Sequence, residues 1–239
     1  MIKVITSKDN QHIKYAYSLK DNKEREAHKE FLGESKKSLE MALNAHLVKE
    51  VFTYEALDID ESIPQFLVNE EVMKKLSPSK NPEGVIFIAK YPEIKKDNLN
   101  KILYLDEIND PGNLGTMIRT ALAFNFDAVI TSKNSVSIYN EKVLAACKGA
   151  NYKINVFQDD FLSIKNGHVV IATSLRDDAI SLEELPSYDK FILVMGNEAR
   201  GISKRCLDLS DVIVKIDIQN IDSLNVAVAA GIIMNKLKK

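Results

Sequence analysis

The chain has few of the residues that mark disulfide-rich or metal-binding proteins. Its 239 residues include two cysteines and four histidines. Cys147 and Cys206 lie far apart and form no Cys-x-x-Cys pattern, so the sequence predicts neither a disulfide framework nor a zinc site. The histidines are scattered along the chain and support no metal site either: they are His12, His28, His46 and His168.

Long apolar runs are also missing. The N-terminal sequence Met-Ile-Lys-Val-Ile-Thr-Ser lacks the apolar core and the cleavage pattern of a signal peptide. The longest apolar stretches, such as residues 191–195, are far too short to cross a bilayer. With 45% hydrophobic and 28% charged residues, the composition is ordinary for a soluble globular protein. We therefore expect a reduced, cytoplasmic protein with one large or two small domains.

A general excess of positive charge is missing too, since the formal net charge is −2. The charges are unevenly distributed, however. Residues 1–37 hold nine Lys and Arg against six Asp and Glu, a net of +3, which leaves −5 for the rest of the chain. An RNA partner would then meet a local basic face rather than a uniformly positive body. The alternative, which composition alone favours, is that these lysines only form a solvated helix face.

The first ~90 residues predict a small α/β unit. Residues 8–30 lack Gly and Pro and form a helical pattern with a thin apolar stripe of Ile13, Tyr17 and Leu19. Strands are expected at 31–33, 48–54 and 85–89, and helices at 36–44 and 69–76, the last opened by Asn69 as a cap. A polar stretch after Pro92 holds the expected linker at 93–100, so the domains would span 1–92 and 101–239.

Short apolar strands alternate with helices after the linker. Strands are expected at 101–106, 128–131, 169–173, 191–195 and 212–216, and helices near 114–124, 140–150, 203–209 and 223–238. Strands that are apolar on both faces imply a parallel sheet covered by helices on both sides. The predicted class is therefore α/β, and the residues alone indicate an ordinary doubly wound sheet.

Three segments place Asn, Ser, Glu or Arg among small residues, each where a strand is expected to end and a helix to begin. The first is Asn-Asp-Pro-Gly-Asn-Leu-Gly-Thr-Met-Ile-Arg-Thr-Ala at 109–121. Its Asn113 is expected to cap the following helix, and Arg119 lies further inside, where the helix dipole disfavours a positive charge. The alternative is a surface Arg on a capped helix. A Rossmann dinucleotide site is disfavoured, because Gly112 and Gly115 do not have its spacing.

The other two segments lie at 193–203 and 221–230. In the former, a buried strand runs into Gly196, where the missing Cβ would let a ligand approach the backbone, and Glu198 could cap a helix or orient a catalytic partner. In the latter, Ser223 is expected to cap a helix and Asn225 to lie in its first turn. Small residues at 227 and 229–231 would let this helix pack closely on another element. For both segments, an ordinary structural corner is the alternative.

Together, in this order and at this separation, the three segments resemble the three motifs of the SpoU (TrmH) family of RNA ribose 2′-O-methyltransferases, which belongs to the SPOUT superfamily. The residues that match the motifs are Asn113 and Arg119, then Gly196, Asn197, Glu198 and Gly201, then Ser223, Leu224 and Asn225. The start of the chain resembles the family's substrate-binding domain more loosely, through Ile5, Ser7, Asn10, Phe31, Leu32, Pro82 and Gly84.

The resemblance implies a deep trefoil knot in the C-terminal parallel-sheet domain, S-adenosylmethionine as methyl donor, and no metal. It also implies an RNA partner, ribosomal RNA ahead of transfer RNA, and a homodimer through the C-terminal domain. The catalytic group would be Arg119 with Asn113, Glu198, Ser223 and Asn225. The residues expected to bind the methyl donor are Gly196, Asn197, Gly201, Ile216, Ile218 and Leu224.

One stretch departs from the family pattern. Residues 216–222 lack the proline and the glycine that usually precede Ser-Leu-Asn in the family. Two alternatives therefore stay open: a knotted module that binds RNA without methylating it, and an unrelated nucleotide-dependent α/β enzyme.

Overall fold

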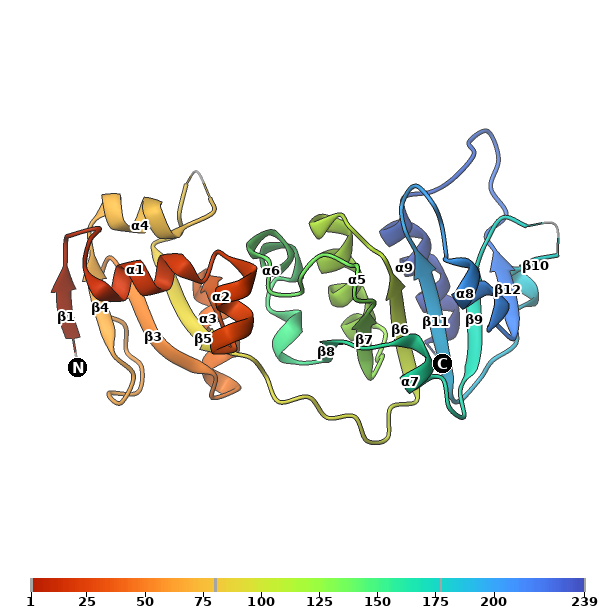
Figure 1. The fold of residues 1–239 in the computed structure, drawn as a ribbon, viewed down its shortest axis with the longest axis horizontal. Coiled ribbons are helices and arrows are strands. Elements are labelled where there is room, and N and C mark those ends of the chain that lie inside the picture. The colour runs from red at the N-terminus through yellow and green to blue at the C-terminus, as the bar shows by residue number, and fades with distance from the viewer. Residues whose placement is uncertain (1, 80, 177, 239) are drawn as a thin grey trace. The chain divides into compact units, whose positions relative to one another are not determined.

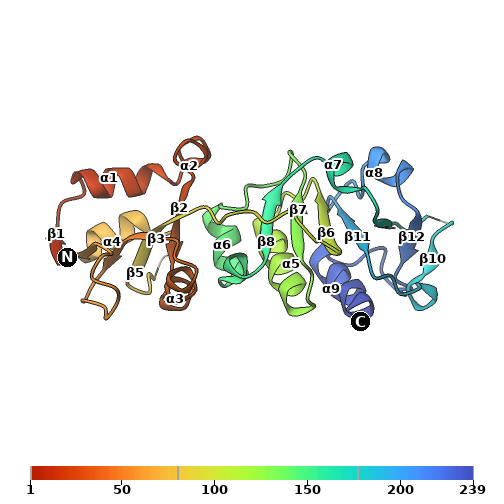
Figure 2. The same cartoon turned by 90° about the horizontal axis from the view of Figure 1, so that it is seen from below.

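The computed structural model describes residues 2–79, 81–176 and 178–238. The chain forms two compact units. The first comprises Met1–Glu93 together with Tyr139–Tyr152, and the second comprises Ile94–Ile138 together with Lys153–Lys239. Figures 1 and 2 show the elements of each unit from two directions. Among the described residues, no helix is long and apolar enough to cross a membrane.

The first unit is built on a five-stranded sheet in the order β1-β4-β3-β5-β2. Strand β5 pairs antiparallel with β2 and β3, and the other pairs are parallel. The elements are β1 (Ile2–Ile5), α1 (Gln11–Ser18), α2 (Asn22–His28), β2 (Glu30–Glu34), α3 (Lys36–Asn44), β3 (Val48–Thr53), β4 (Gln65–Val68), α4 (Glu70–Leu76), β5 (Val85–Lys90), α6 (Glu141–Cys147) and the 3-10 turn η1 (Ala150–Tyr152). The strands and helices predicted between residues 31 and 89 are confirmed, whereas the four-residue strands β1 and β4 are not predicted.

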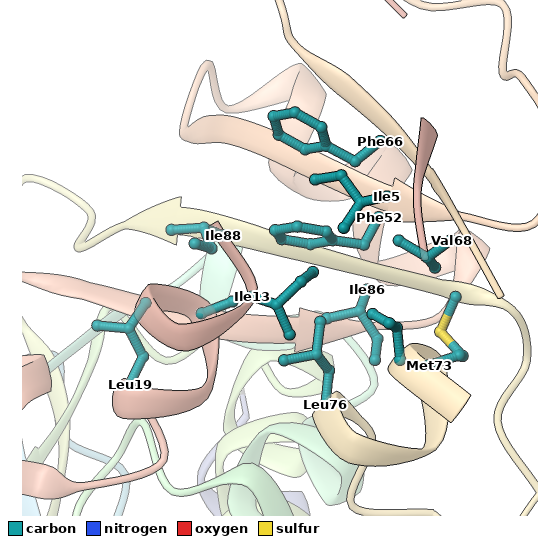
Figure 3. Close-up of a cluster of buried hydrophobic side chains, with 12 residues drawn as sticks. Ile5, Ile13, Leu19, Phe52, Phe66, Val68, Met73, Leu76, Ile86 and Ile88 are labelled. Carbon is teal, nitrogen blue, oxygen red and sulfur yellow. The ribbon is translucent and has the colours of Figure 1, made fainter. Parts of the chain in front are cut away.

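Alternation along the strands buries both faces of this sheet. Phe52, Ile86 and Ile88 belong to the cluster beneath α1 and α4 (Figure 3). Val51 and Phe87, one residue out of step, belong to the cluster beneath α3. Two ring stacks attach the 139–152 segment to that second cluster: Tyr139 lies 4.8 Å from Phe31 and 3.7 Å from Tyr91 between ring centroids. Helices α1 and α4 therefore cover one face, and α3 the other.

The continuous helix expected over 8–30 is wrong. The structure has two helices, because Asp21 accepts a hydrogen bond from the Lys23 backbone N–H at 2.7 Å and caps a new one. The buried Arg25 guanidinium then donates to the Leu19 and Lys20 carbonyls, which satisfies groups left free where α1 ends. Ile13 and Leu19 are buried as expected, but Tyr17 is 47% exposed.

Ser35 adopts a backbone conformation that favours glycine. It caps α3 with φ 90° and ψ 148°, and its hydroxyl accepts from the Ser38 N–H. That region costs a non-glycine residue about 1–3 kcal/mol, whereas glycine is only a few tenths of a kcal/mol worse than serine as a cap. Ser35→Gly is therefore expected to stabilise the protein by about 1 kcal/mol in urea unfolding. Ser203, a cap with φ −60°, is the control, since Ser203→Gly relieves no backbone strain. Lower stability of Ser35→Gly would contradict the strain.

The second unit is built on a seven-stranded sheet in the order β10-β12-β9-β11-β6-β7-β8, with every pair parallel. The elements are β6 (Lys101–Asp106), α5 (Pro111–Ala123), β7 (Ala128–Thr131), β8 (Asn155–Gln158), α7 (Phe161–Ile164), β9 (Val169–Thr173), β10 (Ile180–Ser181), the 3-10 turn η2 (Leu182–Glu184), β11 (Phe191–Gly196), α8 (Lys204–Asp208), β12 (Val212–Lys215) and α9 (Val226–Leu237). The predicted parallel α/β sheet is confirmed; β8 and β10 are not predicted.

Helices cover both faces of this sheet. Figure 2 shows α5 and α9 on one side and α7 and α8 on the other. The small residues of α9 allow it to approach α5: a Cβ added to Gly231 would lie 3.7 Å from the Thr120 methyl. The close packing expected of this helix is therefore confirmed, and its partner is the helix of the first polar segment.

Candidate functional site

The three polar segments follow β6, β11 and β12. All three strands are parallel members of one sheet, so the segments meet at its carboxyl edge. In open α/β sheets, ligands bind in crevices outside this edge. The expectation that each segment joins a strand end to a helix start is confirmed by α5, α8 and α9.

The first segment opens α5 with Asp110 and not, as expected, with Asn113. The Asp110 carboxylate accepts from the Asn113 N–H at 2.7 Å. Pro111 occupies the first helical position, where its missing N–H costs nothing, and this makes the residue before it the cap. Asn113 consequently lies in the first turn with its side chain available for other partners.

Glu198 binds the start of this helix. Its carboxylate accepts from the backbone N–H groups of Asn109 at 3.4 Å and Asp110 at 3.2 Å, and from the Asn113 side-chain amide at 3.2 Å. Burial raises the pKa of the Glu198 carboxyl, but hydrogen bonds from its own backbone, from Asn113 and from the 109–110 backbone outweigh burial and hold that pKa below its usual value. Glu198 is therefore a carboxylate at neutral pH, and it faces the positive end of the helix dipole.

Asn225 links the third segment to the first. Its side-chain N–H donates to Asn113 Oδ1 at 3.0 Å. Its Oδ1 accepts from the backbone N–H groups of Ala227 at 2.9 Å and Val228 at 3.3 Å, so Asn225, not Ser223, caps α9. The reason is that two N–H groups of α9 converge on one Asn oxygen. The chain Glu198–Asn113–Asn225 thus joins segments that lie up to 112 residues apart, and it fixes the orientation of both amides.

The loop of the second segment is a tight turn of the backbone. Asn197 and Gly201 exchange two backbone hydrogen bonds of 2.9 Å, and the Asn197 amide donates to the Glu107 carbonyl at 2.8 Å. A Cβ on Gly196 would lie 2.2 Å from the Ile202 N and 2.3 Å from the Gly201 carbonyl carbon. The expected reason for Gly196, approach of a ligand, is therefore incomplete. The glycine is already required because the Gly201 and Ile202 backbone packs against it.

A cavity of about 700 Å³ lies between the loops at this edge. All six residues predicted to bind a methyl donor line it: Gly196, Asn197, Gly201, Ile216, Ile218 and Leu224. Glu198, Ser223 and Asn225 line it as well. Asn113 and Arg119 do not belong to the lining. The structure thus brings nine of the eleven predicted site residues to one cavity and connects a tenth, Asn113, by hydrogen bonds.

Sequence reasoning misses one wall of the cavity, residues 173–176. Thr173 ends β9, the strand between β11 and β12, and Ser174, Leu175 and Arg176 follow it. The available signal is topological: a strand at 169–173 is predicted, and its carboxyl end must lie at the same edge as the others. The composition of 173–176 carries no comparable signal, because the segment lacks Gly and Asn.

The stretch that departs from the family pattern contains a left-handed turn at Asn220, where φ is 64°. Asn tolerates this conformation better than most other non-glycine residues. A glycine is therefore not required for the chain to reverse between Ile218 and Ser223. Ile216 and Ile218, which precede the turn, both line the cavity.

Two predicted site residues have side chains without a hydrogen bond or ion pair in the described part of the chain. Arg119 is exposed on α5, and its guanidinium has no hydrogen bond or ion pair with any residue in the described ranges. Ser223 is exposed as well, and its hydroxyl is likewise unbonded within the described chain. Both groups are therefore free to meet a ligand, unlike the Glu198, Asn113 and Asn225 side chains, which bind one another.

The match to known families decides the identity of this arrangement. Residues 100–235 match the SpoU rRNA Methylase family, and residues 10–87 match the MRM3-like substrate binding domain. This chain belongs to the SpoU rRNA methylase family. The family prediction is confirmed.

Relatives match over nearly the whole chain. The 23S rRNA (guanosine(2553)-2′-O)-methyltransferase RlmP of Bacillus subtilis is 31% identical, with 99% of this chain and 100% of that protein covered. An AdoMet-bound rRNA methyltransferase from Sinorhizobium meliloti has a TM-score of 0.87 at 24% identity, with 98% and 97% covered. An RNA 2′-O ribose methyltransferase has a TM-score of 0.82 at 26% identity, also with 98% and 97% covered.

Proposed function

We propose that the protein transfers a methyl group from S-adenosylmethionine to a ribose 2′-hydroxyl in ribosomal RNA. The observation that carries the proposal is the cavity lined by the second and third family motifs, to which Asn113 of the first motif is joined by hydrogen bonds with Glu198 and Asn225. The B. subtilis relative is named a 23S rRNA 2′-O-methyltransferase and matches this chain end to end. Transfer RNA is the alternative substrate, and a ribosomal substrate is consistent with the cytoplasmic location that we also propose.

The cavity fits the methyl donor in size and chemistry. Sites for small molecules have volumes of about 300–1,000 Å³ and are mostly apolar with a few placed polar groups, and this cavity measures about 700 Å³. Ile216, Ile218 and Leu224 offer an apolar wall for a purine ring, and the 196–201 loop offers backbone groups. Gly201 has φ 70°, and a Cβ there would meet no atom within 4 Å, so its face is open.

S-adenosylmethionine supplies an electrophilic methyl carbon on a sulfonium. The protein must align a ribose oxygen with that carbon and assist the loss of one proton. We assign alignment to the hydrogen-bonded side chains of Glu198, Asn113 and Asn225, because they hold the loops on both sides of the cavity in one arrangement. We assign stabilisation of the developing alkoxide and contact with a phosphate to Arg119, since a guanidinium keeps its proton at any ordinary pH and binds oxyanions with two N–H groups.

We also propose that the second unit contains the deep trefoil knot of the superfamily. The support is the likeness to the RNA 2′-O ribose methyltransferase structure, with a TM-score of 0.82 at 26% identity. The loops at 195–201 and 216–225, which we expect to form the knot, line the same cavity. A crystal structure whose backbone trace contains no knot would contradict this.

We propose a homodimer through α9. Val228 and Ile232, one turn apart on this helix, are 52% and 40% exposed. Light scattering is expected to give twice the chain mass at micromolar concentration, and Val228→Glu with Ile232→Glu is expected to give a monomer, because burying two carboxylates in an apolar contact costs several kcal/mol. Leu162→Glu, at a site 54% exposed on α7, is the control. A monomeric wild-type protein would remove this proposal.

The first unit is proposed to recruit the RNA. Its support is the match of residues 10–87 to a substrate binding domain and the +3 charge of residues 1–37. Phosphate contacts would give salt-dependent affinity, and unpaired bases or RNA shape would give selectivity.

Transfer of a labelled methyl group tests the proposed function. The purified protein, labelled S-adenosylmethionine and either ribosomal or transfer RNA are incubated, and the RNA is then digested with alkali. A 2′-O-methyl group leaves an alkali-resistant dinucleotide, so label in resistant dinucleotides of ribosomal RNA is expected. Label in transfer RNA alone would favour the alternative substrate. No transfer to either RNA, with RNA binding intact, would favour a binding module.

A further inference from the structure

Two lysines bring their ammonium groups close to the exposed ring of Tyr17 on the first unit. Lys20 Nζ is 5.4 Å from the ring centroid and Lys75 Nζ is 5.2 Å from it. Lys20 follows α1 and Lys75 belongs to α4, so two elements separated by more than 50 residues bring their ammonium groups to one ring. Figure 1 shows α1 and α4 near each other on the same side of the five-stranded sheet.

The ring has no role in the core. Ile13 and Ala16 form the buried side of α1, whereas Tyr17 is 47% exposed. An exposed ammonium over a ring is a weak interaction, so it does not by itself explain why a large aromatic side chain is kept on this surface. Stacking of a nucleic-acid base on the same ring is stronger and tolerates any base, because every base has a π-face.

Within the described residues, no carboxylate neutralises the Lys75 ammonium group, and Glu141 and Glu34 neutralise that of Lys20 only in part. Lys75 Nζ donates to the Lys8 carbonyl at 2.9 Å and has no carboxylate partner within the described residues. Lys20 Nζ donates to the Ser77 carbonyl at 3.4 Å and lies 4.0 Å from Glu141, the limit of an ion pair. Two like charges that converge on one ring repel each other, and an anion between them relieves that repulsion.

We propose that Tyr17, Lys20 and Lys75 form a binding site for single-stranded RNA on the α1–α4 face. An unpaired base stacks on the Tyr17 ring in place of an ammonium group, and the two ammonium groups move off the ring to bind the phosphates on either side of the base. The site rests on the proposed function in one respect, since RNA is taken as the partner of the first unit. It explains the local positive excess before residue 37 through specific side chains rather than through a general solvated face.

The site predicts a preference for unpaired over paired RNA. The probes are a fluorescently labelled hairpin with an unpaired loop and a blunt duplex of the same stem, titrated with the full-length protein by anisotropy. Tyr17→Ala is expected to weaken hairpin binding by about 5- to 150-fold and to change duplex binding by less than ~2-fold. Tyr17→Phe should bind like the wild type, because the ring is retained. Tyr17→Leu should bind like Tyr17→Ala, because it keeps the apolar contact and loses the ring.

The lysines are tested by the salt dependence of binding. Each of Lys20→Ala and Lys75→Ala is expected to lower the slope of log affinity against log salt by about 0.7 on the hairpin. Lys37→Ala is the matched control, since Lys37 is exposed on α3, which covers the opposite face of the sheet. Melting temperatures are measured for every variant so that a loss of binding is read only from folded protein.

Three results would overturn the site: Tyr17→Ala that binds the hairpin within 2-fold of wild type, equal weakening on hairpin and duplex, or a Lys37→Ala effect as large as that of Lys75→Ala. Binding of S-adenosylmethionine by calorimetry and methyl transfer are measured in parallel. If the wild type transfers methyl groups and Tyr17→Ala binds RNA normally, the site fails and the proposed function stands. If the wild type transfers none and the Tyr17 variants still lose hairpin binding, the proposed function fails and the site stands.

Discussion

Replacing Arg119 with alanine is expected to lower the methyl-transfer rate by about 10² or more, which is the scale on which one oxyanion-stabilising group acts. A ribose 2′-hydroxyl becomes a strong nucleophile only as it loses its proton, and charge then develops on its oxygen. The guanidinium of Arg119 is exposed and has no partner in the described part of the chain, so it is available for that oxygen or for a neighbouring phosphate.

The same substitution is expected to leave the fold intact. An exposed side chain without partners contributes within about 0.5 kcal/mol to stability. The expected conflict with the helix dipole is wrong, because Arg119 lies past the middle of α5, beyond the first turn in which the dipole acts. Arg119→Ala should therefore melt within a few degrees of the wild type. The melting temperature and the single-turnover rate, measured on the same preparation, separate a catalytic role from a structural one.

Two further variants sharpen this test. Arg119→Lys should rescue the rate only poorly, because an ammonium cannot make the two-pronged contact that a guanidinium makes. Lys190→Ala, which removes an exposed positive charge just before β11 at the opposite edge of the sheet, should keep the wild-type rate. A rate for Arg119→Ala close to that of Lys190→Ala would show that the chemistry resides elsewhere.

Gly196→Ala is expected to abolish measurable binding of S-adenosylmethionine and to destabilise the protein. A single added carbon would lie 2.2 Å from the Ile202 N, a backbone atom that cannot rotate away. The 196–202 turn must then open, which lowers the free energy of unfolding by about 1–3 kcal/mol. This turn lines the cavity. Unlike the effect of a larger side chain aimed at the ligand, the effect should appear in stability as well as in affinity.

Gly231→Ala is the matched control for this substitution. Its Cβ would meet only the Thr120 methyl, at the ordinary distance of 3.7 Å. Because glycine within a helix is about 0.5–1 kcal/mol less favourable than alanine, this variant should be slightly more stable and should bind the methyl donor normally. Urea unfolding and calorimetry measure both quantities. If Gly196→Ala retained wild-type stability and affinity, the tight turn would not be a requirement of the site.

Much of the second unit could be predicted from its sequence, because its strands are apolar on both faces and its helices are periodic. Five of its seven strands are predicted, whereas β10 has only two residues and β8 has only two apolar residues, Val156 and Phe157, between polar ends. The residues of the cavity could be predicted only through the family resemblance. Composition and spacing do not show that Glu198, Asn113 and Asn225 bind one another, since these contacts span 85 and 112 residues.

The local errors have specific physical causes. Asn113 and Ser223 are good capping residues, but neighbouring residues cap the helices instead. Asp110, which precedes a proline, caps α5, and Asn225, which binds two N–H groups, caps α9. The break between α1 and α2 is made by the Asp21 cap together with Arg25, which folds back on the carbonyls of Leu19 and Lys20. Such a contact has no signature in a polar stretch that lacks Gly and Pro.

Mapping of ribose methylation in ribosomal RNA tests the central claim most directly. Ribosomal RNA is isolated from cells with the gene, from cells without it, and from the latter carrying either the wild-type gene or Arg119→Ala. We expect one ribose methylation to disappear with the gene, to return with the wild-type copy and to stay absent with Arg119→Ala. An unchanged ribosomal methylation pattern in cells that lack the gene would contradict the account.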